Sequence, residues 1–203
     1  ETNSDVEPIL DLEYGKIRLV IAFPDKYSYK NLDSMIADYG KKKKTLRISS
    51  EYLTTASKFI KSLKSYQKYY GKKDPLIVTP WMRLGNNKDV QIHLSFGATE
   101  AKPPEDVDAI MDVTETGTTL KQNKLKIVDE VLTSTAHLII NKKSLKDPKK
   151  REKIFDIITL MRGAVNGRKY LHIYLNVEEK NLKKLLSQMP SLKRPTISPL
   201  SED

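Results

Sequence analysis

Apolar residues in this chain form short runs and alternating stretches that predict strands. Residues 16–24 are almost continuously apolar up to Pro24, which predicts a strand that ends at this proline. Residues 45–50 and 76–79 predict two short strands. Residues 90–96 alternate cleanly, which predicts a strand with one buried face. That face carries Val90, Ile92, Leu94 and Phe96.

The segments between and after these strands show the apolar spacing of helices. Residues 29–39 predict a short helix with Gly40 as its C-cap. Residues 53–70 predict one longer amphipathic helix, capped by Ser50 or Thr54. Residues 149–165 and 178–189 predict two more helices. The helix over 149–165 is expected to bury one face, made by Ile154, Ile157, Ile158, Met161 and Val165.

The remaining segments complete the prediction of an α/β architecture. Residues 125–131, 136–140 and 171–177 predict strands, the last from its alternation. Residues 1–15 are acidic, with a few apolar positions at loosely helical spacing, and are interpreted as a connection. An extended ending is predicted from Pro190, Pro195 and Pro199. Strands that alternate with helices are typical of α/β proteins.

The most informative stretch is residues 107–120, which read VDAIMDVTETGTTL. An apolar run stops abruptly at a loop of small and hydroxylated residues, which predicts a buried strand with a functional loop at its carboxyl end. Gly117 permits close approach of the backbone to a ligand, and successive N–H groups beside threonine hydroxyls favour a phosphate. The alternative is a polar turn between two strands. A second strand-end loop, FGATEAKPP, occupies residues 96–104.

Charge and composition narrow the classes of partner. The chain has 203 residues and a net charge of +10, which favours polyanionic partners such as nucleotides, phosphorylated sugars, nucleic acid or an acidic membrane. It contains no cysteine, which excludes disulfides and thiolate chemistry, and its three histidines are too widely spaced to suggest a metal cluster. Lysines alternate with tyrosines over residues 58–70, which fits either RNA binding or a solvated helix face.

A family resemblance sharpens this picture. DVTETGTTLKQNKL, residues 112–125, resembles the phosphoribosyl-pyrophosphate loop of the ATP phosphoribosyltransferases, which begin histidine biosynthesis. KIRLVIAFP resembles the strand that opens the family's second catalytic lobe. RISSEYLT resembles its "TEYP" segment, with Leu53 in place of proline, and FGATEAKPP resembles its "SGATEAAP" loop. Residues 168–200 resemble the start of the regulatory domain in the family's long form.

The resemblance implies a fold and its domains. The fold is expected to be the second lobe of a periplasmic-binding-protein-like (type II) catalytic fold, followed by the start of a ferredoxin-like regulatory domain. Residues 1–15 would connect from a missing first lobe, 16–140 would form the second lobe, 141–167 a helix returning to the first lobe, and 168–203 the beginning of the regulatory domain. Residues 60–90 are longer than the family's usual connection. We expect this chain alone to be inactive.

The resemblance also implies an activity. The family transfers the phosphoribosyl group of phosphoribosyl pyrophosphate to N1 of ATP with Mg²⁺, giving phosphoribosyl-ATP and pyrophosphate. The expected partners are ATP, phosphoribosyl pyrophosphate and further copies of the chain, a hexamer in the long form, without nucleic acid or membrane, in the cytoplasm. A non-catalytic phosphate- or nucleotide-binding α/β module is the alternative, and a nucleic-acid-binding protein is a third.

Roles for individual residues follow from the same resemblance. Asp112, Glu115 and Glu100 are the expected catalytic residues, and Glu51 and Tyr52 are expected to bind the nucleotide. The residues expected to bind phosphoribosyl pyrophosphate are Thr114, Thr116, Gly117, Thr118, Thr119 and Leu120. No protein ligand to a metal is expected. The alternatives are a capping role for Asp112, a solvated charge for Glu100 and simple packing for Tyr52.

Overall fold

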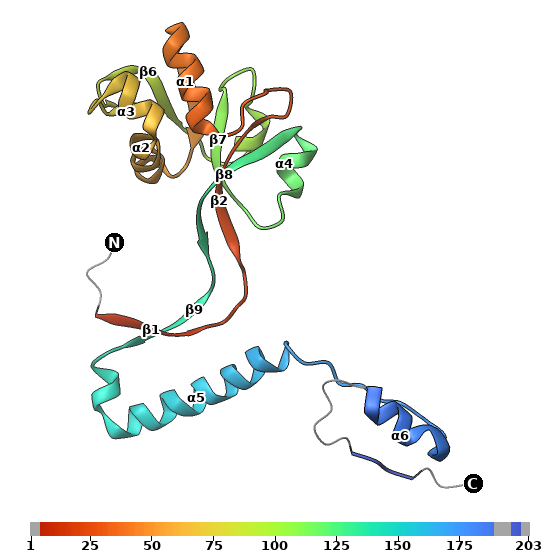
Figure 1. The fold of residues 1–203 in the computed structure, drawn as a ribbon. Coiled ribbons are helices and arrows are strands. Elements are labelled where there is room, and N and C mark those ends of the chain that lie inside the picture. The colour runs from red at the N-terminus through yellow and green to blue at the C-terminus, as the bar shows by residue number, and fades with distance from the viewer. Residues whose placement is uncertain (1–4, 189–195, 200–203) are drawn as a thin grey trace. The chain divides into compact units, whose positions relative to one another are not determined.

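The computed structural model describes residues 5–188 and 196–199 and divides into two compact units, Glu1–Arg162 and Gly163–Asp203. The first unit contains a seven-stranded sheet with the order β5-β4-β6-β3-β7-β2-β8 (Figure 1). The strands are β2 (Ile17–Pro24), β3 (Leu46–Ser50), β4 (Pro75–Val78), β5 (Arg83–Leu84), β6 (Asn87–Leu94), β7 (Ala109–Thr114) and β8 (Leu125–Ser134).

The sheet is mixed. Strands β4, β6, β3 and β7 run parallel, whereas β5 is antiparallel to β4. Strand β2 is antiparallel to both of its neighbours, β7 and β8. The expected α/β class is therefore confirmed, with a parallel centre that sends the carboxyl ends of β3, β6 and β7 to the same edge.

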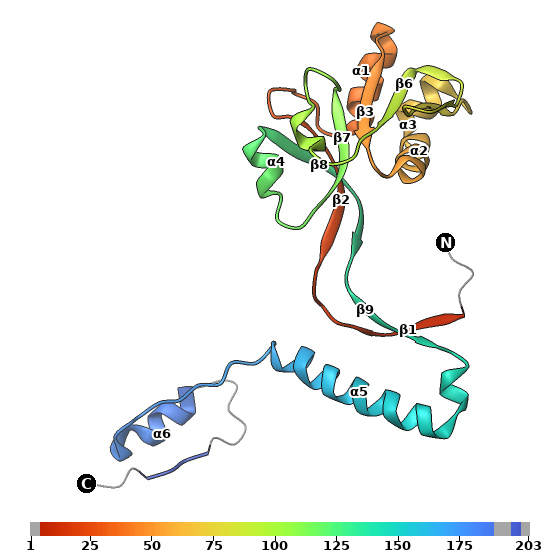
Figure 2. The same cartoon turned by 180° about the vertical axis from the view of Figure 1, so that it is seen from behind.

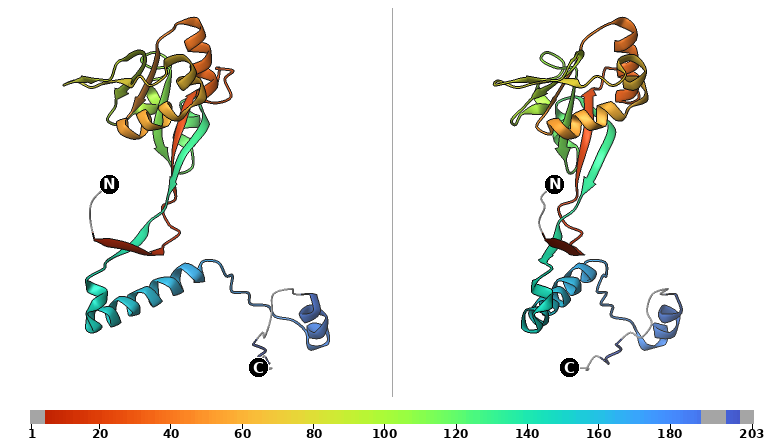
Figure 3. Two further views of the ribbon diagram at one scale, coloured as in Figure 1. Left: turned by 60° about the vertical axis from the view of Figure 1, so that its left-hand side comes forward. Right: turned by 90° about the vertical axis from the view of Figure 1, so that its left-hand side faces the viewer.

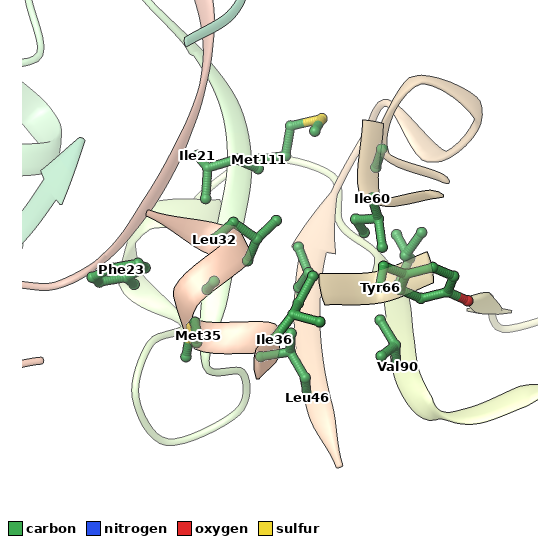
Figure 4. Packing of buried hydrophobic residues seen from close by; sticks show 14 of the residues in the cluster. Ile21, Phe23, Leu32, Met35, Ile36, Leu46, Ile60, Tyr66, Val90 and Met111 are labelled. Atoms are coloured by element: carbon green, nitrogen blue, oxygen red, sulfur yellow. The ribbon is translucent and has the colours of Figure 1, made fainter. Parts of the chain in front are cut away.

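Helices cover both faces of this sheet, and the alternation of β2 explains how. Leu19, Ile21 and Phe23 point to the face covered by α1 (Leu32–Lys42), α2 (Leu53–Ser62) and α3 (Lys64–Tyr70), where they join the main core (Figure 4). Val20 and Ala22 point to the other face, where they pack in one cluster with Leu120 of α4 (Thr118–Gln122). Helix α4 lies on the side of the sheet away from α2 and α3 (Figure 2). Burial on both faces accounts for the unbroken apolar run of β2.

A separate two-stranded sheet pairs β1 (Val6–Asp11) with β9 (His137–Asn141). It continues the β2–β8 pair, because the Leu12 N–H donates to the Ala136 carbonyl at 2.9 Å (Figure 3). The strand predicted over 136–140 is confirmed. Residues 6–11, whose apolar positions have loosely helical spacing, form a strand because they pair with β9, which lies far away in the sequence.

Three helix limits also differ from the prediction. Gly40 lies inside α1, where its Cα side faces the Tyr69 ring, and Lys43 caps the helix in the left-handed conformation at φ 53°. The single helix expected over 53–70 is broken at Leu63, whose extended backbone separates α2 from α3. Neither expected cap forms: Tyr52 is the N-cap residue of α2, without a side-chain cap.

The hairpin between β4 and β6 was not predicted. Strand β5 pairs antiparallel with β4, and β6 begins at Asn87, three residues before the predicted start of that strand. Val90 and Ile92 are fully buried as expected, but Phe96 is 72% exposed because the strand ends before it.

The last helices form, but the strand between them does not. Helix α5 (Pro148–Gly167) buries Ile158 and Val165, while Ile157 and Met161 of its expected buried face are exposed. Residues 171–177 are exposed and not in a strand, because alternation alone cannot form one without a partner, and the described part of the second unit provides none. Helix α6 (Glu179–Gln188) follows.

Some predictions are left open. Pro190 and Pro195 lie outside the described residues, and Pro199 lies in coil. The functional limits of the four predicted domains stay predictions. Within the described residues, no helix combines the length and apolar character needed to cross a membrane.

Candidate functional site

Three loops that are far apart in the sequence meet at one edge of the sheet. Strand β3 lies between β6 and β7, and Ser50 at its carboxyl end pairs with Leu94 and Met111. The segments that follow these strands, residues 50–52, 95–102 and 114–119, are here called the three carboxyl-edge loops. Ligands of open α/β sheets bind at such an edge.

The loop over residues 114–119 is held by its own threonines. The Thr114 hydroxyl accepts the Gly117 N–H at 2.9 Å, and the Thr116 hydroxyl accepts the Thr118 N–H at 3.3 Å. The Thr116 and Thr118 hydroxyls lie 2.9 Å apart. Within the described chain, the N–H groups of Glu115 and Thr116 have no protein partner, so they remain available to an anion.

Gly117 is the residue that shapes this loop. Its φ of 80° lies in the left-handed region, and an added Cβ would sit 3.3 Å from the Ile127 Cδ1 atom. Any other residue would be strained by its backbone and crowded by β8. A loop with this backbone and with free N–H groups is suited to a phosphate rather than to a bulky apolar ligand.

The loop over residues 95–102 is fixed at its base by a buried polar network. The Lys102 Nζ donates to the Ser95 Oγ at 2.6 Å, and the Ser95 and Thr99 hydroxyls lie 3.0 Å apart. Ser95 and Thr99 are both almost fully buried. Glu100 lies in the short 3-10 helix that follows, Thr99–Ala101, and is half-buried.

The loop over residues 50–52 is hydrogen-bonded to the loop over residues 95–102. The Glu51 Oε1 accepts the Gly97 N–H at 2.8 Å, and the Ser50 Oγ accepts the Tyr52 N–H at 2.9 Å. Tyr52 is 40% exposed, so its ring is not part of the core.

Asp112 interacts electrostatically with two of the three carboxyl-edge loops. Its pKa is raised above the ordinary value mainly because burial penalises the charged carboxylate, and the Glu100 and Glu51 carboxylates raise it further. A hydrogen bond from the Val113 N–H to Oδ1, at 2.7 Å, acts in the opposite direction. Because Asp112 bonds to its neighbour rather than to residues 114–119, the bonds found here do not make it a cap of that loop.

The structure thus brings Glu51, Glu100 and Asp112 to one edge, together with the threonine loop. Thr118, Thr119 and Glu115 are exposed there, whereas the Leu120 side chain is buried against the β2–β8 side of the sheet. Any ligand contact from Leu120 would come from its main chain. Among the described residues, no group of three or more His, Asp or Glu side chains is arranged to hold a metal ion by itself.

Ser95 and Lys102 were missed by sequence reasoning. Nothing in FGATEAKPP indicates that the lysine folds back onto the serine, since that contact depends on the 3-10 turn between them. A groove of about 610 Å³ lies elsewhere, between α2 and the β4–β5 hairpin, and none of the predicted site residues lines it.

The sequence is similar to that of a known enzyme family over its whole length. The family model for ATP phosphoribosyltransferase matches residues 1–163, and the model for the HisG C-terminal domain matches residues 167–203. The ATP phosphoribosyltransferase of Solibacter usitatus is 38% identical over 208 residues, which cover 100% of this chain and 61% of that protein. The enzyme of Chlorobium luteolum is 32% identical over 208 residues, with 100% and 60% covered.

A solved structure shares the fold. The ATP phosphoribosyl transferase (HisG:HisZ) complex from Thermotoga maritima aligns with a TM-score of 0.52 and 21% identity, over 80% of this chain and 63% of that one. At this identity the likeness concerns the α/β fold alone. The present chain spans about three fifths of the length of the curated relatives that it matches.

Proposed function

The chain belongs to the ATP phosphoribosyltransferase family, and we propose that the whole protein transfers the phosphoribosyl group of phosphoribosyl pyrophosphate to N1 of ATP. The products would be phosphoribosyl-ATP and pyrophosphate, in the first step of histidine biosynthesis. The observation that supports this proposal is the convergence of Glu51, Glu100 and Asp112 with the threonine loop at one sheet edge.

The reaction needs positioning and electrostatics more than a covalent nucleophile. Negative charge grows on the departing pyrophosphate while the ribose becomes oxocarbenium-like, so fixed donors and acceptors lower the barrier. The Glu115 and Thr116 N–H groups, with the exposed hydroxyls of Thr118 and Thr119, would bind the 5′-phosphate. The left-handed backbone of Gly117 brings these donors close to the phosphate.

The carboxylates would act on the sugar side. Asp112 and Glu100 would accept hydrogen bonds from the ribose hydroxyls and would face the positive charge that develops on the ring. Burial of Asp112 strengthens this electrostatic interaction, because the local dielectric is low. Tyr52, exposed at the same edge, would lie beside the nucleotide.

Mg²⁺ is part of the proposal. Since the described residues provide no protein cage for a metal, the ion would arrive with the pyrophosphate, and Asp112 and Glu100 would contact its water shell. When bound, the ion neutralises charge on the leaving pyrophosphate. The protein residues orient the phosphates and the ribose around it.

The proposal extends to the domains of the whole protein and to its oligomeric state. We place residues 16–140 in the second lobe of a periplasmic-binding-protein-like (type II) fold, with the first lobe outside this chain, and residues 168–203 at the start of a ferredoxin-like regulatory domain. The match of residues 167–203 to the HisG C-terminal domain model supports the placement of the regulatory domain. A cytoplasmic homo-oligomer, a hexamer for the long form, is proposed on family membership.

The test is the reaction itself. Full-length protein incubated with ATP, phosphoribosyl pyrophosphate and Mg²⁺ is expected to form phosphoribosyl-ATP, measured by its absorbance and by mass spectrometry. The 203-residue chain alone is expected to form none, because the opposite wall of the cleft is proposed to lie outside it. Full-length protein that binds phosphoribosyl pyrophosphate without forming product would favour the non-catalytic binding module instead.

A further inference from the structure

We propose that Glu51 is a positioning residue that fixes the tip of the loop over residues 95–102 and so orients Glu100, rather than a residue that binds ATP. The catalytic consequence rests on the proposed transferase function. The structural part does not, since it concerns one hydrogen bond between two loops.

The contact itself is well defined. The Gly97 N–H donates to the Glu51 Oε1 at 2.8 Å, within the usual range of a charge-assisted hydrogen bond. The two residues follow different strands, β3 and β6, which are parallel neighbours. One carboxylate oxygen of Glu51 is therefore already occupied by the protein, in the place where a nucleotide contact was predicted.

The tip of the loop needs such a support. Gly97 and Ala98 both have left-handed backbone, at φ 68° and 48°, and that conformation carries a steric cost for alanine. Phe96 is 72% exposed, and Gly97 and Ala98 are exposed as well, so no apolar burial fixes the tip. An exposed segment with strained backbone keeps its conformation only when its surroundings impose it.

The other contacts of this loop lie at its base. Ser95 donates its N–H to the Ser50 carbonyl at 3.2 Å and carries the bonds to Thr99 and Lys102. Within the described residues, Glu51 provides the one side-chain hydrogen bond that reaches the tip. The base is thus fixed by buried hydroxyls and the tip by a single exposed carboxylate.

Movement of the tip would reach Glu100 directly. The Ala98 carbonyl accepts the Ala101 N–H at 3.2 Å and closes the 3-10 turn that carries Glu100. If Ala98 leaves its left-handed conformation, this turn opens and the Glu100 carboxylate changes direction. Small errors in the placement of a reacting or orienting group can lower rates by up to about a hundredfold.

The first experiment measures the hydrogen bond by amide exchange in the full-length protein. Glu51→Ala is expected to raise the exchange rate of the Gly97 amide at least about tenfold, whereas Glu51→Gln keeps an acceptor oxygen and should change it less than about threefold. Glu105→Ala, an exposed carboxylate after the same loop, is the matched control and should leave Gly97 unchanged. Unchanged exchange in Glu51→Ala would overturn the proposal.

The second experiment separates positioning from ATP binding. Glu51→Ala is expected to lower kcat about tenfold or more while KM for ATP stays within about twofold, and Glu51→Gln should restore most of kcat. If both variants raise KM for ATP and Gly97 exchange does not change, Glu51 binds ATP and the proposal is wrong. If the wild-type protein forms no phosphoribosyl-ATP, the proposed function fails, but the exchange experiment still decides whether Glu51 fixes the loop.

Discussion

The loops over residues 95–102 and 114–119 resemble each other in position but not in how they are stabilised. Each follows a parallel strand of the same sheet, and each contains a left-handed glycine, Gly97 or Gly117. The loop over residues 114–119 is held by threonine hydroxyls that accept hydrogen bonds from N–H groups two or three residues away. The loop over residues 95–102 is held at its base by its own Ser95, Thr99 and Lys102, but its tip depends on Glu51, which is 46 residues away from Gly97 in the sequence.

This difference shows two ways to build a site edge. A loop that is held by its own side chains keeps its shape without contacts from other segments of the chain. A loop whose tip is held by a neighbour keeps that tip in place only while the neighbour stays in place. On the proposed function, the first kind would present backbone N–H groups to a phosphate, and the second would orient Glu100.

The largest effect is expected from a substitution of Asp112, which lies in β7 between the two loops in the sequence. On the proposed mechanism, Asp112→Asn is expected to lower turnover about a thousandfold in the full-length protein, because it removes a charged group that would contact the ribose. Steady-state formation of phosphoribosyl-ATP measures this effect. Turnover within about threefold of wild type would remove Asp112 from the catalytic residues.

The same substitution makes a prediction about pH. Because the folded-state pKa of Asp112 is raised, its contribution to stability is fully present below its ordinary pKa of 3.8 and is lost as pH rises through the folded value. The amide that replaces the carboxyl group does not titrate. The free energy of unfolding of Asp112→Asn relative to wild type is therefore expected to improve from acidic to neutral pH. A constant difference would contradict the raised pKa.

Two glycine variants separate loop geometry from backbone strain. Gly117→Ala and Gly71→Ala both place alanine at a positive φ, 80° and 63°, and both should lose stability, Gly71→Ala the more because its ψ of −127° lies outside the left-handed helical region. Turnover should fall about a hundredfold only for Gly117→Ala, because Gly71 lies at the end of α3, outside the three carboxyl-edge loops. Equal turnover in the two variants would reject a special role for Gly117.

The free energy of unfolding should distinguish the buried Ser95 network at the base of the 95–102 loop from the hydrogen bond of Thr114 in the 114–119 loop. Ser95→Ala is expected to cost about 2 kcal/mol, because Thr99 and Lys102 both lose a buried partner. Thr114→Val should cost about 1 kcal/mol, since one partly buried bond to the Gly117 N–H is lost. Thermal unfolding measures both. A larger loss for Thr114→Val would mean that the local loop is the more rigidly held.

The smallest expected effect concerns Ala98. Replacing it by glycine relieves left-handed strain at φ 48° but adds backbone entropy to the unfolded chain, so a net gain of about 0.5 kcal/mol is expected. Ala164→Gly, in the exposed part of α5, is the control and should lose a similar amount. Chemical denaturation measures both, and a destabilised Ala98→Gly would show that the left-handed strain is not real.

Sequence reasoning succeeded where a local pattern determines the structure. The apolar run of β2, the strand-to-loop transition at Thr114 and the extended conformation of residues 46–50 all follow from neighbouring residues. It failed where a distant partner decides. Val6–Asp11 is a strand because it pairs with β9. Residues 171–177 are not in a strand, because the described part of the chain provides no partner strand for them.

The site follows the same division. The loop over residues 114–119 could be predicted because the residues that form it follow one another in the sequence. The contact of Glu51 with Gly97 and that of Lys102 with Ser95 could not, because they depend on the parallel pairing of β3 with β6 and on the turn at Thr99. The family resemblance named the residues of this edge, but not the bonds between them.

The pairing of β2 has a consequence for the protein during its synthesis. This strand is buried on both faces, yet both of its partners, β7 and β8, begin only at Ala109 and Leu125. At about 5–20 residues per second, a ribosome needs on the order of ten seconds to extend the chain from Pro24 to β7. Throughout that interval the nascent chain carries an apolar strand with both edges open, which is the kind of segment that chaperones bind.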